Sequence, residues 1–68
     1  MKDYDYEKHL KLLNYIKSLN YSILTSQKII LHILKAKQNL GKDLNEKALK
    51  ILQTTPDEKE ALEKILKL

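Results

Sequence analysis

Residues 25–41 have the sequence TSQKIILHILKAKQNLG, and this stretch decides the expected fold. At 100° per residue, apolar side chains cover well over half of the circumference of the helix that it predicts. These side chains are Ile29, Ile30, Leu31, Ile33, Leu34, Ala36 and Leu40. The narrow polar stripe that remains consists of Lys28, His32, Lys35 and Asn39. A helix with so little polar surface lies in the middle of a bundle or contacts a partner, so we expect it to be the central helix.

Capping residues predict where this helix begins and ends. Thr25 or Ser26 offers a hydroxyl to the first unpaired N–H groups, and Gly41 offers a left-handed exit. The helix is therefore expected to run to about residue 39, after a short connector at residues 21–24.

The first 19 residues predict another amphipathic helix. It is expected to begin after Asp3 or Asp5, whose carboxylates suit a helix N-terminus, and to stop at a left-handed Asn20. Its predicted apolar arc consists of Tyr6, Leu10, Leu12, Leu13, Ile16 and Leu19. Its other side carries Lys8, Lys11, Tyr15 and Ser18.

Two further helices are expected after Gly41. A capping box at residues 43–46, Asp-Leu-Asn-Glu, predicts a helix over about residues 44–53. Thr55 as the cap, Pro56 in the first helical position and Glu58 in the third predict a last helix that runs to the C-terminus.

Together these elements predict an all-α fold, a compact three- to four-helix bundle with short connectors, in one domain over residues 1–68. A 68-residue chain buries a thin core, and this chain has no cysteine with which to form disulfides. Self-association is therefore an expected way of covering apolar surface.

Composition excludes several kinds of chemistry. With no cysteine and one glycine, the chain has no thiol nucleophile, no Cys-based zinc site and no glycine-rich phosphate loop. No Ser-His-Asp order is present, so we expect no enzyme, no catalytic residue and no cofactor.

The two histidines do not suggest a metal site. His9 falls on the apolar arc of the first helix and His32 on the polar stripe of the second, while Asp3 and Asp5 are the only acids nearby in the sequence. A zinc ion needs about four ligands, so no metal is expected. We expect His9 instead to be partly buried, hydrogen-bonded to a neighbour or placed at a dimer seam.

The charges are distributed unevenly along the chain. All 13 cations are lysines, and the 35 residues between Glu7 and Asp43 contain seven lysines and no acid. This segment is a solvated face or a surface for a polyanion or an acidic partner. The candidate residues for nucleic-acid or acidic-partner binding are Lys8, Lys11, Tyr15, Lys28, His32 and Lys35.

Sequence-specific DNA recognition is not expected. A helix-turn-helix with Gly41 at its turn would have Lys37 in place of the usual small residue. The chain also lacks arginine, which makes the commonest contact with guanine. Lysines can still bind phosphates without selecting a sequence, so non-specific DNA binding through residues 8–42 is the alternative function.

The principal functional expectation is a protein-protein interaction or regulatory module. The apolar arcs of the first two helices are broader than so small a chain can cover, which points to a protein partner or a second copy. The candidate partner-binding residues are Leu12, Ile16, Ile30, Leu31 and Leu34.

Membrane binding is not expected, because the second helix has no Trp or Phe anchor and no apolar run approaches the ~20 residues of a membrane span. The N-terminal residues 1–8 are too charged for the start of a signal peptide, so we expect a cytoplasmic protein.

Overall fold

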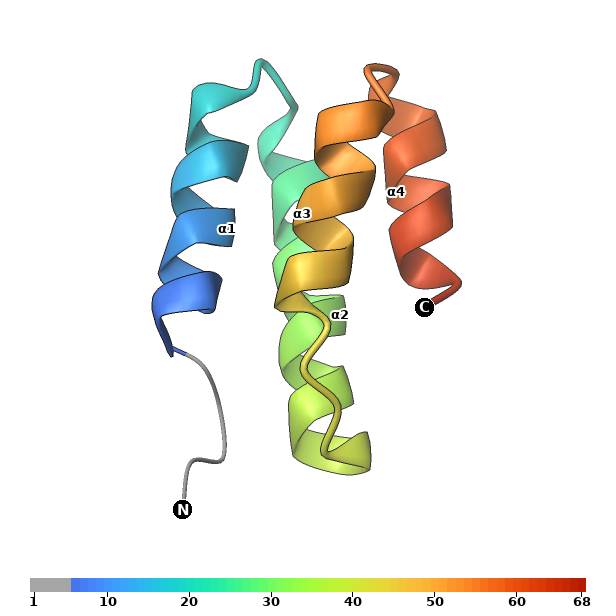
Figure 1. Cartoon of the computed structure of the whole chain (residues 1–68). Helices are drawn as coiled ribbons and strands as arrows, with labels where there is room; N and C mark the ends of the chain where they lie inside the picture. Colours follow the sequence, from blue (N-terminus) through green and yellow to red (C-terminus); the bar gives the residue numbers. More distant parts are fainter. Residues whose placement is uncertain (1–5) are drawn as a thin grey trace.

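The computed structural model describes residues 6–68, which form four α-helices (Figure 1). The helices are α1 (Tyr6–Ser18), α2 (Ile23–Leu40), α3 (Asn45–Thr54) and α4 (Glu58–Leu66). The connectors are the short segments 19–22, 41–44 and 55–57. The predicted all-α bundle with short connectors is confirmed. The proposed caps Asp3 and Asp5 lie outside the described residues.

The packing of the helices does not follow their order in the chain. α1 packs mainly against α3, α3 also packs against α4, and α4 packs against α2. In Figure 1, α2 and α3 occupy the middle of the view, between α1 and α4. The sequential neighbours α1 and α2 are not among these three main packing pairs, so the side of the bundle between them is less closed.

All four helices contribute to a single core at intervals of three or four residues, which is the spacing of one helix face. The buried apolar side chains are Leu12, Ile16, Ile29, Ile33, Ala36, Leu44, Ala48, Leu52, Ala61 and Ile65. Half-buried side chains, including Tyr15, Ile30 and Leu49, pack around this core.

The ends of α2 confirm one prediction and correct another. Gly41 has a φ of 65° in the left-handed region, as expected, and its N–H donates to the carbonyl of Lys37. The N-cap is not Thr25 or Ser26 but Ser22, whose Oγ accepts the N–H of Thr25 at 3.2 Å. The helix therefore begins at Ile23, earlier than predicted.

The predicted left-handed stop at Asn20 is wrong, because no residue other than glycine within residues 6–68 has a positive φ. α1 ends at Ser18, and the N–H of Leu19 donates to the carbonyl of Ile16 at 3.1 Å. A tight turn of the backbone thus closes the helix without a left-handed residue.

The start of α3 differs from the predicted capping box. The carboxylate of Asp43 accepts the backbone N–H of Asn45 at 3.0 Å, while Leu44 occupies the N-cap position without a side-chain bond. Glu46 does not turn back toward Asp43. Its carboxylate instead forms an ion pair of 3.4 Å with Lys8 of α1.

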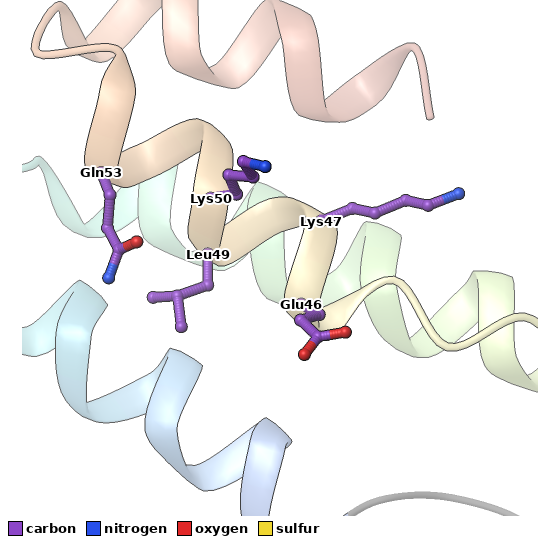
Figure 2. Close-up of a pocket in the computed structure, with 5 residues that line it drawn as sticks. All are labelled: Glu46, Lys47, Leu49, Lys50 and Gln53. Carbon is purple, nitrogen blue, oxygen red and sulfur yellow. The ribbon is translucent and has the colours of Figure 1, made fainter.

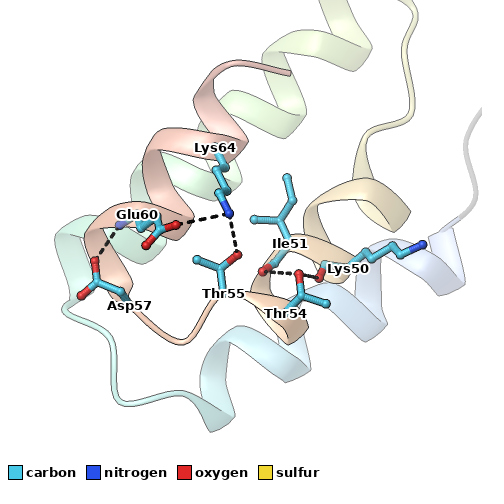
Figure 3. A network of polar contacts seen from close by, with 7 residues as sticks. All are labelled: Lys50, Ile51, Thr54, Thr55, Asp57, Glu60 and Lys64. Atoms are coloured by element: carbon cyan, nitrogen blue, oxygen red, sulfur yellow. Dashed lines mark hydrogen bonds and ion pairs between the residues drawn. The ribbon is translucent and has the colours of Figure 1, made fainter.

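The start of α4 also corrects the prediction. Asp57, rather than Thr55, is the N-cap, and its carboxylate accepts the N–H of Glu60 at 3.0 Å (Figure 3). Thr55 is buried beneath the turn, where its hydroxyl lies 3.5 Å from Nζ of Lys64. Lys64 also pairs with Glu60 one turn away at 3.3 Å.

Glu58 connects the start of α4 to the start of α2. Its Oε2 accepts the backbone N–H of Ser22 at 3.2 Å and lies 3.0 Å from the Ser22 hydroxyl. The first turn of α2 contains no acidic residue, so Glu58 supplies the negative charge that favours a helix N-terminus. The Thr25 hydroxyl, followed by the N–H of Ser22, lowers the pKa of Glu58 by hydrogen bonding to the carboxylate.

Candidate interaction surface

The outer side of α2 carries a row of exposed apolar side chains. Ile23 is 78% exposed, Leu24 62%, Leu31 55% and Leu34 41%. The core residues of α2, such as Ile29, occupy the opposite side of the same helix. We call these four exposed residues the α2 row.

Two members of the α2 row were missed by sequence reasoning. Ile23 and Leu24 were assigned to a connector, because the N-cap was expected at Thr25 or Ser26. Once Ser22 is the cap, both residues belong to the first turn of α2. The signal in the sequence was the hydroxyl of Ser22 three residues before Thr25, which is the spacing of an N-cap bond.

The predicted partner-binding face is partly corrected. Leu12 is fully buried and Ile16 is 4% exposed, so both belong to the core, and of the two only Ile16 borders a groove at the surface. Ile30 is half-buried, whereas Leu31 and Leu34 are exposed. The apolar arc of α1 was too broad to show which part of it faces α3.

An apolar groove lies between the end of α1 and the start of α2, two helices that are not among the three main packing pairs. Its volume is about 280 Å³. It is lined by Leu13, Ile16, Lys17, Leu19, Tyr21, Ile23, Ser26, Gln27 and Ile30. Burial, and then the negative charge of Glu58, raises the pKa of Tyr21 in this lining.

The residues predicted for nucleic-acid or acidic-partner binding divide into two groups. Lys28, His32 and Lys35 line a shallow hollow on α2 together with Leu31 and Leu66. Lys28 and Lys35 are exposed, whereas His32 is half-buried. The Nε2 atom of His32 is buried and has no hydrogen-bond partner within residues 6–68.

The other three candidates lie on α1. Lys11 is exposed, but Lys8 forms the ion pair with Glu46. Tyr15 is half-buried against the core, although the sequence placed it among the lysines away from the apolar arc. A base could not stack on Tyr15 without competing with this packing.

His9 is buried inside the chain, and the prediction of a hydrogen-bonded histidine is confirmed. Its Nδ1 lies 2.9 Å from Oδ1 of Asn45 on α3. The amide nitrogen of Asn45 donates to the carboxylate of Asp43 at 2.8 Å. This chain of polar groups holds α1 against the start of α3, and we assign it a structural role.

Residues 6–68 also contain a hollow along α3. The hollow along α3, of about 430 Å³, is lined by side chains of mixed charge, and Leu49 points from it toward α1 (Figure 2). Within residues 6–68, no three His, Asp or Glu side chains gather as a metal ion would require. In the same part of the chain, no helix is both long and apolar enough to cross a membrane.

Comparison with known proteins found no matching family model, no matching curated protein and no matching solved structure.

Proposed function

We propose that this chain is a small protein-interaction module that binds a protein partner through the α2 row. The observation that carries the proposal is the exposure of Ile23, Leu24, Leu31 and Leu34 along a helix whose opposite side forms the core. Burying a side chain of this kind fully contributes about 1.5–3 kcal/mol. Burial of four such side chains on one helix would therefore favour binding and offset part of the ~4–15 kcal/mol that association costs.

Binding, rather than catalysis, is the role that the described residues support. The polar groups at His9 are bonded to one another through Asn45, which joins α1 to the start of α3. A different protein is favoured over a second copy of the chain as the partner, since two α2 rows placed together would bring Lys28 and Lys35 of one copy close to those of the other.

A site-specific cross-linking experiment tests this proposal. The full chain is expressed in its native cell with a photo-reactive residue at position 31, or at the exposed position 47 on α3 as a matched control. We expect position 31 to give defined protein adducts that position 47 does not give. The double substitution Leu31→Gln, Leu34→Gln should weaken capture from a reactive residue at position 24. Equal capture from positions 31 and 47 would refute the proposal.

Non-specific nucleic-acid binding is the second candidate. It is favoured by Lys28 and Lys35, which are exposed two turns apart on a helix without acidic residues. Titration of DNA and RNA at two salt concentrations tests it, since phosphate binding weakens steeply with salt. Binding with a steep salt slope that is lost in the double substitution Lys28→Glu, Lys35→Glu would support this candidate. Absence of binding at ~50 mM salt would eliminate it.

A further inference from the structure

Two matching rows of side chains border the groove between α1 and α2. Leu13 on α1 and Ile30 on α2 line the groove itself. Residues three, four or seven positions away lie on the same side of each helix, so the row on α1 extends for about two turns, roughly 10 Å, and the row on α2 for about three turns, roughly 16 Å. The rows are Tyr6, Leu10 and Leu13 on α1, and Ile23, Ile30 and Leu34 on α2.

Much of this apolar surface is not covered by the chain itself. Tyr6 is 69% exposed and Leu10 48%, and Ile23 is the most exposed of the large apolar residues described. The other three sides of the bundle are closed by the α1–α3, α3–α4 and α4–α2 contacts. The α1–α2 side is thus where one more helix would complete the packing.

Charge selects the kind of helix that fits. Lys17 lines the groove, whereas Lys28 and Lys35 line the hollow beside Leu66 of α4, on the far side of α2. α2 has no acidic residue, and α1 has none after Glu7 in its first turn. An occupant with carboxylates along its edges would meet Lys17 and no acidic side chain of α2, while a basic occupant would be repelled by Lys17.

A second copy of this chain fits the groove poorly. Two α2 helices placed together would bring lysines against lysines. In a second copy, the helix that could present carboxylates to the groove is α4, which carries Glu60 and Glu63. The apolar residues Ala61 and Ile65 of α4 are already buried in the core, so α4 has no strong apolar face to insert.

We propose that the α1–α2 groove binds an amphipathic helix of another protein, apolar on the face that enters the groove and acidic along its edges. This inference rests on the proposed function as a protein-interaction module and names the chemistry of the partner. Apolar contacts supply the affinity, while Lys17 selects the acidic partner.

A peptide library provides the probe. Helical peptides of about four turns (roughly 14 residues) are displayed with leucines at helical spacing and with edge positions free to be Glu, Lys or Gln. They are selected against the full-length chain. We expect Glu to be enriched over Lys at the edge positions, relative to the unselected library.

Substitutions then locate the binding of a selected peptide, measured by fluorescence anisotropy. The double substitution Leu10→Gln, Ile23→Gln should weaken binding tenfold or more, as both residues are exposed and in the rows. Lys17→Glu should weaken binding of the acidic peptide about fivefold and strengthen binding of its Lys counterpart. The matched control is Leu40→Gln, at an exposed leucine of α2 outside this groove, which should leave affinity within about twofold. Circular dichroism verifies that each variant remains folded.

Several results would overturn the inference. One is a library that yields no binding peptide, and another is a set of selected peptides that carry Lys or Gln rather than Glu at their edge positions. A third is a selected peptide that still binds the Leu10→Gln, Ile23→Gln variant with unchanged affinity. A dimer in light scattering that this substitution converts to a monomer would make a second copy the occupant. In each of these cases, cross-linking at position 31 tests binding of a protein partner independently of the peptide experiments. The proposed function can therefore stand while the acidic helix is rejected.

Discussion

The chain of polar groups from His9 to Asp43 leads to a specific prediction about stability. A carboxylate only accepts hydrogen bonds, so the amide nitrogen of Asn45 faces Asp43 and its amide oxygen faces His9. His9 Nδ1 must therefore carry a hydrogen and donate it. The interaction joins residues 36 positions apart in the chain, on α1 and α3.

Asn45→Ala removes the side-chain bonds of an almost completely buried asparagine to His9 and Asp43 while leaving its backbone N–H bonded to Asp43. A net hydrogen bond contributes about 0.5–1.5 kcal/mol, and a bond to a charged group about 1.5–3 kcal/mol. We therefore expect a loss of about 2–4 kcal/mol in the free energy of unfolding. For a domain of this size the total is of order 3–10 kcal/mol, so the variant should be severely destabilised.

Urea unfolding followed by far-ultraviolet circular dichroism measures this loss. The variants are His9→Ala, Asn45→Ala and the double substitution, with Asn14→Ala at an exposed position of α1 as the control. Because His9 and Asn45 share a bond, their effects should be non-additive by about 1 kcal/mol or more, while the control changes stability by less than ~0.5 kcal/mol. A coupling below ~0.5 kcal/mol between His9 and Asn45 would refute the reasoning.

Four further predictions concern helix ends, the core and the surface. The pKa of Glu58 lies below its ordinary value of 4.5 in the folded chain, so its contribution is present at neutral pH and is lost as the pH falls through the folded pKa. Glu58→Gln, which replaces the charged acceptor for Ser22 by a neutral amide oxygen, should lower stability at neutral pH. The difference from the unmodified chain should shrink as the pH falls below 4.5 and the carboxylate becomes protonated, and an unchanged difference in acid unfolding would contradict this. Ile33→Ala empties a fully buried position and should cost about 2–5 kcal/mol by urea unfolding, whereas a cost under ~1 kcal/mol would mean that the core collapses around the cavity. An alanine Cβ at Gly41 would meet nothing within 4 Å, so Gly41→Ala should cost only the left-handed backbone penalty of about 1–2 kcal/mol, and a larger loss of thermal stability would reveal a contact. Leu31→Gln should change the unfolding free energy by less than ~0.5 kcal/mol, and marked destabilisation would place Leu31 in the core.

Sequence reasoning predicted what local chemistry determines. The helical spacing of apolar residues gave four helices, and the lone glycine at position 41 gave the end of α2. A glycine after an amphipathic segment has few competitors as a left-handed stop, so this prediction needed no tertiary information.

The helix starts were harder to predict, because each had more than one capping side chain nearby. Ser22 and Thr25 both carry a suitable hydroxyl, and Thr55 competes with Asp57. Tertiary contacts accompany the observed choices, since Glu58 bonds Ser22 from another helix and Thr55 is buried under the turn. No local pattern contains these contacts.

The exposed surface was only partly predictable for the same reason. The apolar arc of α1 includes Leu10, Leu12 and Ile16, and the sequence does not show that Leu12 and Ile16 face the core while Leu10 faces out. The orientation of α1 depends in part on His9 meeting Asn45, which is a contact between distant residues. The composition of the surface was predictable, whereas the partition between core and surface was not.

The order in which the helices pack has a consequence for folding and for fragmentation. The pairs α1–α3 and α2–α4 alternate along the chain, so a cut in the connector at residues 41–44 separates both pairs at once. Neither the fragment 1–41 nor the fragment 42–68 would retain its full set of packing partners. Each would expose the core residues that the other covers, so the two pieces should be weakly structured alone and should fold together when mixed. After such a cut, the two fragments should therefore fold only when they associate, because the α1–α3 and α2–α4 contacts form between them.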